Sequence, residues 1–241
     1  MYRFATYVWR DTIRWKRAPL NVLSTLAMPA AWLIFMGLVM PVKYDNYLDF
    51  VTPGILVLTM LTSSLGAGSS IMFDKTLGYL NKFLALPSPR ESILIGKIVF
   101  ITLRGLMQST VILIISILIG ATIYPISTYI GMYILLTLFG ISISALGTTV
   151  ALYLDNHDSY AAFQAFVSMP LYFASTALIP MNEMPDALRY IAEFNPLTYA
   201  IDGIRDIAQG IIPTFSICFL IILAILIMIV CSWKFRSITI G

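Results

Sequence analysis

Charged residues are scarce in this sequence. Asp, Glu, Lys and Arg make up 11% of the 241 residues, whereas they make up about a quarter of a typical soluble domain. Hydrophobic residues reach 59%, more than the core of one soluble domain of this length can hide. This composition excludes a disordered chain, a collagen, a coiled coil and a small disulfide scaffold. It indicates an integral membrane protein.

The residue types needed for catalysis and metal binding are also few. The single histidine, His157, provides neither a histidine cluster nor an HExxH zinc motif. Both cysteines, Cys218 and Cys231, lie in the last apolar stretch, which argues against a disulfide or thiolate site. Gly96-Lys97 lacks the upstream glycine and the following Ser or Thr of a P-loop. We therefore expect no catalytic residue, no metal site and no cofactor bound by this chain.

Long charge-free runs divide the chain into membrane spans. About 20 apolar residues cross the hydrocarbon core, and these runs do not alternate apolar with polar residues as barrel strands do. The run 105–154 is long enough for two crossings and is interrupted at 124–128. The sequence predicts an all-α polytopic membrane protein with a single transmembrane domain, 1–241. Its six transmembrane helices are expected near residues 21–40, 50–71, 98–123, 129–154, 160–178 and 215–231.

Basic residues are distributed unequally between the segments that connect the spans. Eleven lie on the side that holds both termini and the segment between spans two and three, and three lie on the other side. Because Lys and Arg accumulate in cytoplasmic loops, we expect both termini in the cytoplasm and a multi-pass protein of the inner or plasma membrane. This orientation explains the basic excess without nucleic-acid binding. The first 17 residues lack the short apolar core of a cleavable signal peptide.

The segment 1–18 is expected to form an N-terminal interfacial helix. At 100° per residue, basic side chains gather on one side and mostly apolar ones on the other, as suits the headgroup layer. The alternative is a flank that only sets the topology. The basic side carries Arg3, Arg10, Arg14 and Arg17, and the other side carries Phe4, Val8, Thr12 and Trp15.

Small and hydroxyl residues are concentrated in two of the spans. In span four, Gly140, Ser144 and Thr148 recur every four residues and predict a packing face. Span two is richer still in such residues, and close helix packing is the simpler explanation for them. The alternative is that span two lines a transport pathway.

Arg104 is the one charged residue inside a predicted span. It lies about two turns into span three, where a long guanidinium side chain extends to the headgroups. An inner-leaflet anchor is therefore favoured over a substrate contact. Secondary transporters and channels commonly carry ionisable residues near mid-membrane. We expect none there in this chain, which disfavours that alternative function.

The long cytoplasmic segment 73–97 contains a predicted short helix, 75–85. Leu77, Leu80 and Leu84 fall on one face of that helix, and Pro87 follows its end. An apolar helix face presented to the cytoplasm needs a cover. We expect a partner protein to supply it, the alternative being that the helix lies on the bilayer.

A second patterned segment, 180–212, precedes the last span. Residues 185–186 favour the start of one short helix, and Asn195-Pro196 separates it from a second over 197–209. Ile201, Ile204 and Ala208 line the apolar side of the second helix. Its polar side carries Asp202, Arg205, Asp206 and Gln209. Such helices are expected to cap a cavity or to re-enter the membrane at the outer side.

Two segments resemble the ABC type-2 transporter permease family, the membrane subunit of ATP-binding-cassette exporters. The first is FDKTLGYL at 73–80, continuing through LPSPR at 86–90 to Gly96-Lys97. The second is NPLTYAIDGIR at 195–205, ending at Gly210. The pattern is more similar to the drug-exporter branch of the family than to the polysaccharide branch.

The resemblance implies a function and a set of partners. A coupling helix within 74–90 would dock on a separate nucleotide-binding ATPase subunit, which binds ATP and Mg. Two permease chains, here expected as a homodimer in the lipid bilayer, would move a drug-like, lipid or glycan substrate by alternating access. Spans two and five would line the pathway. The implied coupling residues are Asp74, Lys75, Leu77, Gly78, Leu80, Leu84, Pro87 and Arg90. The outer helix motif comprises Asn195, Pro196, Tyr199, Asp202 and Arg205, and the pathway residues are Thr59, Thr62, Ser63, Phe163 and Phe166.

Overall fold

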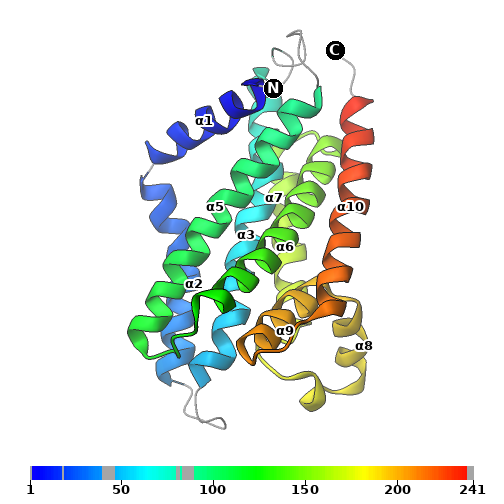
Figure 1. The fold of residues 1–241 in the computed structure, drawn as a ribbon. Helices are drawn as coiled ribbons and strands as arrows, with labels where there is room; N and C mark the ends of the chain where they lie inside the picture. The colour runs from blue at the N-terminus through cyan, green and yellow to red at the C-terminus, as the bar shows by residue number, and fades with distance from the viewer. Residues whose placement is uncertain (1, 18, 40–46, 80–81, 83–89, 238–241) are drawn as a thin grey trace.

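The chain folds into a bundle of long helices in the computed structural model (Figure 1). The structure describes residues 2–17, 19–39, 47–79, 82 and 90–237. Within these ranges every element is helical, and no strand occurs. The all-α expectation is therefore confirmed for the described part of the chain.

Each of the six apolar segments predicted as a span forms a helix. These helices are α2 (Pro19–Val39), α3 (Tyr47–Thr76), α5 (Arg90–Ile119), α6 (Ile126–Tyr153), α7 (His157–Phe173) and α10 (Thr214–Arg236). Over the described residues, α3, α5, α6 and α10 are long and apolar enough to cross a membrane. The apolar part of α2 that meets the same description is shorter, Thr25–Gly37. The six-span count remains a prediction.

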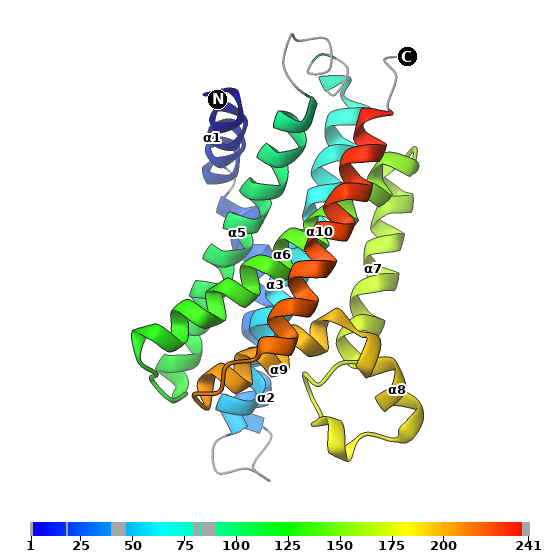
Figure 2. The ribbon, with the colours of Figure 1, turned by 45° about the vertical axis from the view of Figure 1, so that its right-hand side comes forward.

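The ends of the long helices sort into two groups. The start of α1 (Tyr2–Lys16), the end of α3, the start of α5 and the end of α10 lie at one end of the bundle (Figure 1). The two short helices α8 (Asp186–Phe194) and α9 (Pro196–Ala208) lie at the opposite end, as Figure 2 shows from a second direction. A 3₁₀ turn, Met181–Glu183, precedes α8. The predicted pair of short helices before the last long helix is thus present.

Helix α3 forms the centre of the bundle. It packs against α2, α5, α6, α7 and α9, and its buried residues cover most of its length. The main apolar core surrounds it and includes Ile55 and Met60 of α3, Phe139 of α6 and Ile201 of α9. Any cavity beside α3 is therefore bordered by helices that pack against α3.

Small residues allow the closest helix crossings, as the packing interpretation predicts. A Cβ atom added to Gly68 of α3 would lie 2.3 Å from the carbonyl oxygen of Gly147 in α6 and 2.2 Å from the Tyr160 hydroxyl of α7. That hydroxyl donates a 2.6 Å hydrogen bond to the Leu65 carbonyl oxygen. Three helices meet here at a distance that only glycine permits. The packing face predicted on span four is likewise buried, at Gly140, Ser144 and Thr148.

Two connections between the long helices differ from the prediction. The break between spans three and four falls at 120–125, because Gly120 adopts a φ of 123° and Pro125 directly precedes α6. Helix α3 continues to Thr76, beyond the end predicted at residue 71. Gly78 then adopts a φ of 69°, a left-handed conformation that interrupts the helix predicted over 75–85.

The N-terminal helix α1 packs against the bundle. Val8 and Trp15, on its predicted apolar side, contact a buried cluster formed by Ala67 of α3 with Phe100 and Ile101 of α5. This side therefore covers protein, because α3 and α5 present an apolar surface to it. The helix itself is confirmed, whereas its position at a membrane surface remains a prediction.

Candidate functional site

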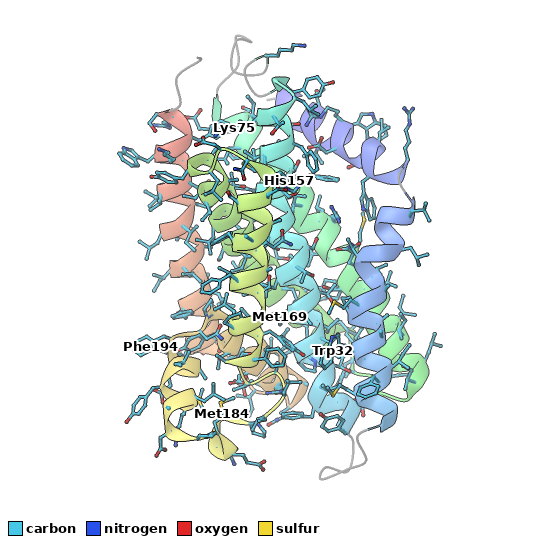
Figure 3. All side chains as sticks on the ribbon, turned by 180° about the vertical axis from the view of Figure 1, so that it is seen from behind. Trp32, Lys75, His157, Met169, Met184 and Phe194 are labelled. Atoms are coloured by element: carbon cyan, nitrogen blue, oxygen red, sulfur yellow. The ribbon has the colours of Figure 1, made fainter. Side chains whose placement is uncertain are left out.

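A cavity of about 260 Å³ lies between α2, α3, α5 and α7. Figure 3 shows two of its side chains, Met169 from α7 and Trp32 from α2, on the face of the bundle where α3 runs between these helices. Half of the side chains in its wall are aromatic, Met, Pro or Leu, and the other half are polar and come from α2, α3, α5 and α7. The lining comprises Thr25, Met28, Pro29, Trp32, Leu58, Thr62, Ser63, Arg104, Gln108, Gln164, Ser168, Met169, Tyr172 and Phe173.

Arg104 is the charged residue of this cavity. It lies halfway along α5, about 21 Å of helix from Arg90. Its Nε atom is buried without a hydrogen-bond partner. Among the described residues, no acidic side chain forms an ion pair with it. An arginine near a bilayer centre costs about 2.5–3.5 kcal/mol on the insertion scale, so an arginine on a helix that is apolar enough to cross a membrane is a candidate functional residue.

The depth of Arg104 in the membrane remains a prediction, but its place in the bundle is now known. Helix α5 begins at Arg90, eight residues before the span start predicted at residue 98, and Arg104 lies near the middle of this helix. A charged residue does line the middle of the bundle. The expected lack of an ionisable residue inside the bundle therefore no longer argues against a secondary transporter.

Uncharged polar groups surround the same cavity. Gln108 donates a 2.6 Å hydrogen bond from Nε2 to Thr25 Oγ1, which ties α5 to α2. Ser63 Oγ and the Tyr172 hydroxyl are buried with no hydrogen-bond partner among the described residues. Buried polar atoms without partners are uncommon in folded proteins. Their gathering around one cavity suits a polar group of a bound molecule.

The cavity brings together only some of the predicted pathway residues. Thr62 and Ser63 line it, whereas Thr59 points elsewhere and donates a 2.7 Å hydrogen bond to the Ile55 carbonyl oxygen. Phe163 packs against Tyr160 with ring centroids 5.8 Å apart. Phe166 is 78% exposed on α7. A transport role for any of these five residues remains a prediction.

A buried ion pair holds α3 to α5 near the ends that face the predicted coupling segment. Lys97 Nζ lies 2.5 Å from Asp74 Oδ2, and each side chain is 2% exposed. Lys97 also donates a 2.8 Å hydrogen bond to Ser70 Oγ. Arg10 of α1 approaches the same carboxylate at 3.8 Å and pairs with Asp11 at 2.6 Å. Asp74 is therefore enclosed by α1, α3 and α5.

This geometry changes the interpretation of the coupling residues. Asp74 and Lys75 form the last turn of α3 and do not start a separate helix, because the ion pair with Lys97 compensates the buried charge of Asp74. Lys75 donates a 2.7 Å hydrogen bond to the Leu154 carbonyl oxygen. Leu77 is 55% exposed. Leu80, Leu84 and Pro87 lie outside the described residues, and Arg90 begins α5.

The outer helix motif is built around Asn195. Its Nδ2 donates hydrogen bonds to the carbonyl oxygens of Leu171, at 2.6 Å, and Ala174, at 2.9 Å. Its Oδ1 accepts a hydrogen bond from the Leu197 N–H and so caps α9. Pro196 is the first residue of α9, where its missing N–H costs nothing. One residue thus joins the end of α7 to the start of α9.

Two residues on the polar side of α9, Asp202 and Arg205, bond to other parts of the bundle, whereas Gln209 at the end of this side is exposed. Asp202 accepts a 2.7 Å hydrogen bond from Thr176 and pairs with Arg205 at 3.1 Å. Arg205 also donates to the Phe50 carbonyl oxygen and stacks on the Phe50 ring. Burial raises the pKa of the Asp202 carboxyl, and the Thr176 hydrogen bond and Arg205 oppose that shift. Tyr199 stacks on Phe219 of α10, with centroids 4.0 Å apart. The motif therefore connects α3, α7, α9 and α10.

Residues 2–208 match the family described as ABC-2 type transporter. The chain belongs to this family. The transport permease ycf38 of Cyanophora paradoxa is 35% identical over 206 residues, which cover 82% of this chain and 71% of the relative. The doxorubicin resistance ABC transporter permease DrrC of Mycobacterium tuberculosis is 27% identical over 206 residues, covering 82% and 73%. Nodulation protein J of Rhizobium leguminosarum is 27% identical over 220 residues, covering 88% and 84%.

The family assignment confirms the resemblance drawn from the two sequence motifs. This ABC-2 permease is a multi-pass membrane protein and the membrane subunit of an ABC transporter. The permease itself is not an enzyme, since ATP hydrolysis in this family takes place in a separate subunit.

Several residues of the two sites were not singled out by sequence reasoning. In the ABC-2 permease, Gln108, Gln164 and Tyr172 line the cavity, and Lys97, known from the sequence as the end of the first motif, was given no part in an ion pair. A usable signal exists for the two glutamines. An amide side chain within an apolar run is costly unless it finds a polar partner, so both merited the attention given to Arg104.

Proposed function

We propose that this ABC-2 permease forms the membrane pathway of an ATP-driven exporter. Two copies, crossing the membrane six times each with both termini in the cytoplasm, would move a substrate outward by alternating access. The match of residues 2–208 to the ABC-2 type transporter family carries this proposal. Drug-like molecules, lipids and glycans remain the candidate substrate classes, and the drug-resistance permease among the relatives favours the first.

The arrangement of the helix ends supports the proposed orientation. The start of α1, the end of α3, the start of α5 and the end of α10 share one end of the bundle (Figure 1). The basic excess of the sequence belongs to the same segments. Under the positive-inside rule this end faces the cytoplasm. The segment 74–90 would then be available to a cytoplasmic ATPase, and α8 and α9 would lie at the outer side.

The cavity supports a pathway beside α3 and α7. These are spans two and five, and α2 forms the opposite border of the cavity. A twofold partner that presents its own α2 and α7 would enclose the cavities of both copies. Closure of the ATPase subunits would act on the coupling segment and switch the access of that enclosed space.

ATP-driven uptake into inside-out vesicles tests the proposal. The full chain is reconstituted with its ATP-binding subunit, and uptake of a fluorescent drug such as doxorubicin is followed with ATP or a non-hydrolysable analogue. We expect uptake only with hydrolysable ATP and only when both subunits are present. Equal uptake by the permease alone would instead establish the ATPase-independent transporter or channel.

Single cysteines test the orientation separately. In a chain with Cys218 and Cys231 replaced by Ser, cysteines are introduced at Lys43, Pro87 and Asp186. We expect a membrane-impermeant thiol reagent to label positions 43 and 186 from outside and position 87 only from the cytoplasmic side. Labelling of position 186 only from the cytoplasmic side would overturn the six-span orientation.

A further inference from the structure

The chemistry of the cavity narrows the class of ligand that it takes. Arg104 brings one positive charge to a wall that is otherwise aromatic, aliphatic or uncharged polar. A positive charge in an apolar environment is costly, and a negative group nearby stabilises it most strongly. Among the described residues no acidic side chain pairs with Arg104. The complement of this cavity is therefore an anion.

A second copy of the chain does not provide that negative charge. In the twofold arrangement the partner presents its α2 and α7 to the cavity. Helix α2 contains no Asp or Glu, and the one acidic residue of α7, Asp158, lies in its first turn. The cavity is lined by residues of α7 from Gln164 onward, at least one and a half turns further along the helix. A carboxylate from the partner subunit thus falls at the wrong depth.

Arg104 and two uncharged groups of the same cavity provide hydrogen-bond donors for such an anion. Arg104 Nε, Ser63 Oγ and the Tyr172 hydroxyl are all buried without a hydrogen-bond partner among the described residues. Each of the three groups carries a hydrogen that it can donate. Three donors around one cavity match the oxygen atoms of an acidic group. The remaining wall, with Trp32 and Phe173, suits a flat apolar body.

We propose that this cavity binds an amphipathic organic anion, with its acidic group at Arg104 and its apolar body between α2 and α7. The proposal rests on the transport function above and names the substrate class of the same site. The acidic group is a carboxylate, sulfonate or phosphate. It belongs either to a small solute or to the headgroup of an anionic lipid.

Equilibrium dialysis with two matched probes tests the proposal. Naphthalenesulfonate carries a negative charge, and naphthalenesulfonamide has the same ring system without it. Binding is measured to the full chain in phosphatidylcholine nanodiscs, with protein-free nanodiscs subtracted. We expect the parent protein to prefer the sulfonate by about tenfold or more, equivalent to about 1.4 kcal/mol.

Three variants link that preference to Arg104. Arg104→Gln removes the charge and should abolish the preference, whereas Arg104→Lys should keep part of it. Gln164→Glu places a negative charge in the cavity and should abolish the preference without altering Arg104, which keeps the test valid if Arg104→Gln fails to fold. Arg189→Gln removes a basic charge from α8, outside the cavity, and should change nothing.

Phosphatidylglycerol in the nanodiscs distinguishes the two sources of the anion. If a lipid headgroup is the ligand, this lipid lowers the sulfonate affinity of the parent protein; if a solute is the ligand, the affinity stays unchanged. Equal affinity of the parent for both probes, or an undiminished preference in Arg104→Gln, would overturn the proposal. Dialysis requires neither ATP nor the ATPase, so this failure would leave ATP-driven transport standing, and a failure of transport would leave the anion site standing.

Discussion

Removing one partner of the Asp74–Lys97 pair should destabilise the protein strongly. Asp74→Asn leaves the Lys97 ammonium 2% exposed and without its 2.5 Å counter-charge. The 2.8 Å hydrogen bond from Lys97 to Ser70 Oγ would remain, but the Ser70 hydroxyl is neutral and does not compensate the positive charge. Breaking a buried pair in this way costs about 3–5 kcal/mol. Arg10 does not offset the loss, because it is positively charged like Lys97 and cannot act as a counter-charge to it.

The double variant Asp74→Asn/Lys97→Met separates charge burial from other effects. Removing both charges leaves neither one unpaired, and such replacements are often close to neutral. The free energy of unfolding should therefore fall less in the double variant than in either single variant. Asp155→Asn is the matched control, since Asp155 also pairs with a lysine, Lys75, but is 96% exposed. Exposed pairs contribute about 0–1 kcal/mol.

Two measurements on the same variants decide between a structural and a docking role for Asp74. The free energy of unfolding in mixed detergent micelles reports the stability, and pull-down of the ATPase subunit reports docking. We expect Asp74→Asn to lose stability and the double variant to recover stability and docking together. Unchanged stability of Asp74→Asn, combined with loss of the ATPase, would refute the reasoning and restore Asp74 as a docking residue.

Three further substitutions test other parts of the structure. Gly68→Ala should destabilise by about 1–3 kcal/mol, because its Cβ would lie 2.3 Å from a backbone oxygen of α6. Gly66→Ala on the same helix should not, since no atom lies within 4 Å of its Cβ. Asn195→Ala should cost about 2–3 kcal/mol, the sum of a lost cap and two lost hydrogen bonds, and more than Pro196→Ala. Leu77→Asp should reduce recovery of the ATPase in a pull-down and leave the thermal midpoint unchanged, because Leu77 is 55% exposed.

Each of these expectations has an opposing outcome. Equal thermal midpoints for the two glycine variants would mean that the three-helix crossing is looser than described. A larger loss from Pro196→Ala than from Asn195→Ala would assign the helix junction to the proline ring. Undiminished ATPase recovery with Leu77→Asp would remove Leu77 from the docking surface.

Local patterns in the sequence were sufficient for the long helices, but not for the helix predicted over 75–85, which Gly78 interrupts. Charge-free runs marked α2, α3, α5, α6, α7 and α10, since a helix that satisfies its own backbone is the economical structure for an apolar run. Asn195-Pro196 marked the junction of α8 and α9 correctly, because proline acts on its immediate neighbours. Predictions of this kind depend on residues a few positions apart.

The polar contacts depend on pairs that lie far apart in the chain, and these were missed. Asp74 was placed in the coupling segment 74–90 by the family resemblance, and its partner Lys97 lies 23 residues further along the chain, on the next long helix. Arg205 was assigned to the polar side of its helix, but the sequence did not show that it binds the Phe50 carbonyl oxygen. Periodicity records which side of a helix is polar. It does not predict which other helix or loop provides the hydrogen-bonding partners for that side.

Helices α3 and α5 provide the residues of the buried pair and also form two walls of the cavity. On α5, Lys97 and Arg104 are seven residues apart, or about 10 Å of helix. On α3, Asp74 and Ser63 are separated by about 16 Å. Because the pair fixes α3 to α5 where the predicted coupling segment joins them, a displacement applied there moves both helices together. Two walls of the cavity would then shift as one body against α2 and α7, and such a relative movement changes access to the space around Arg104 without breaking the helices that form it.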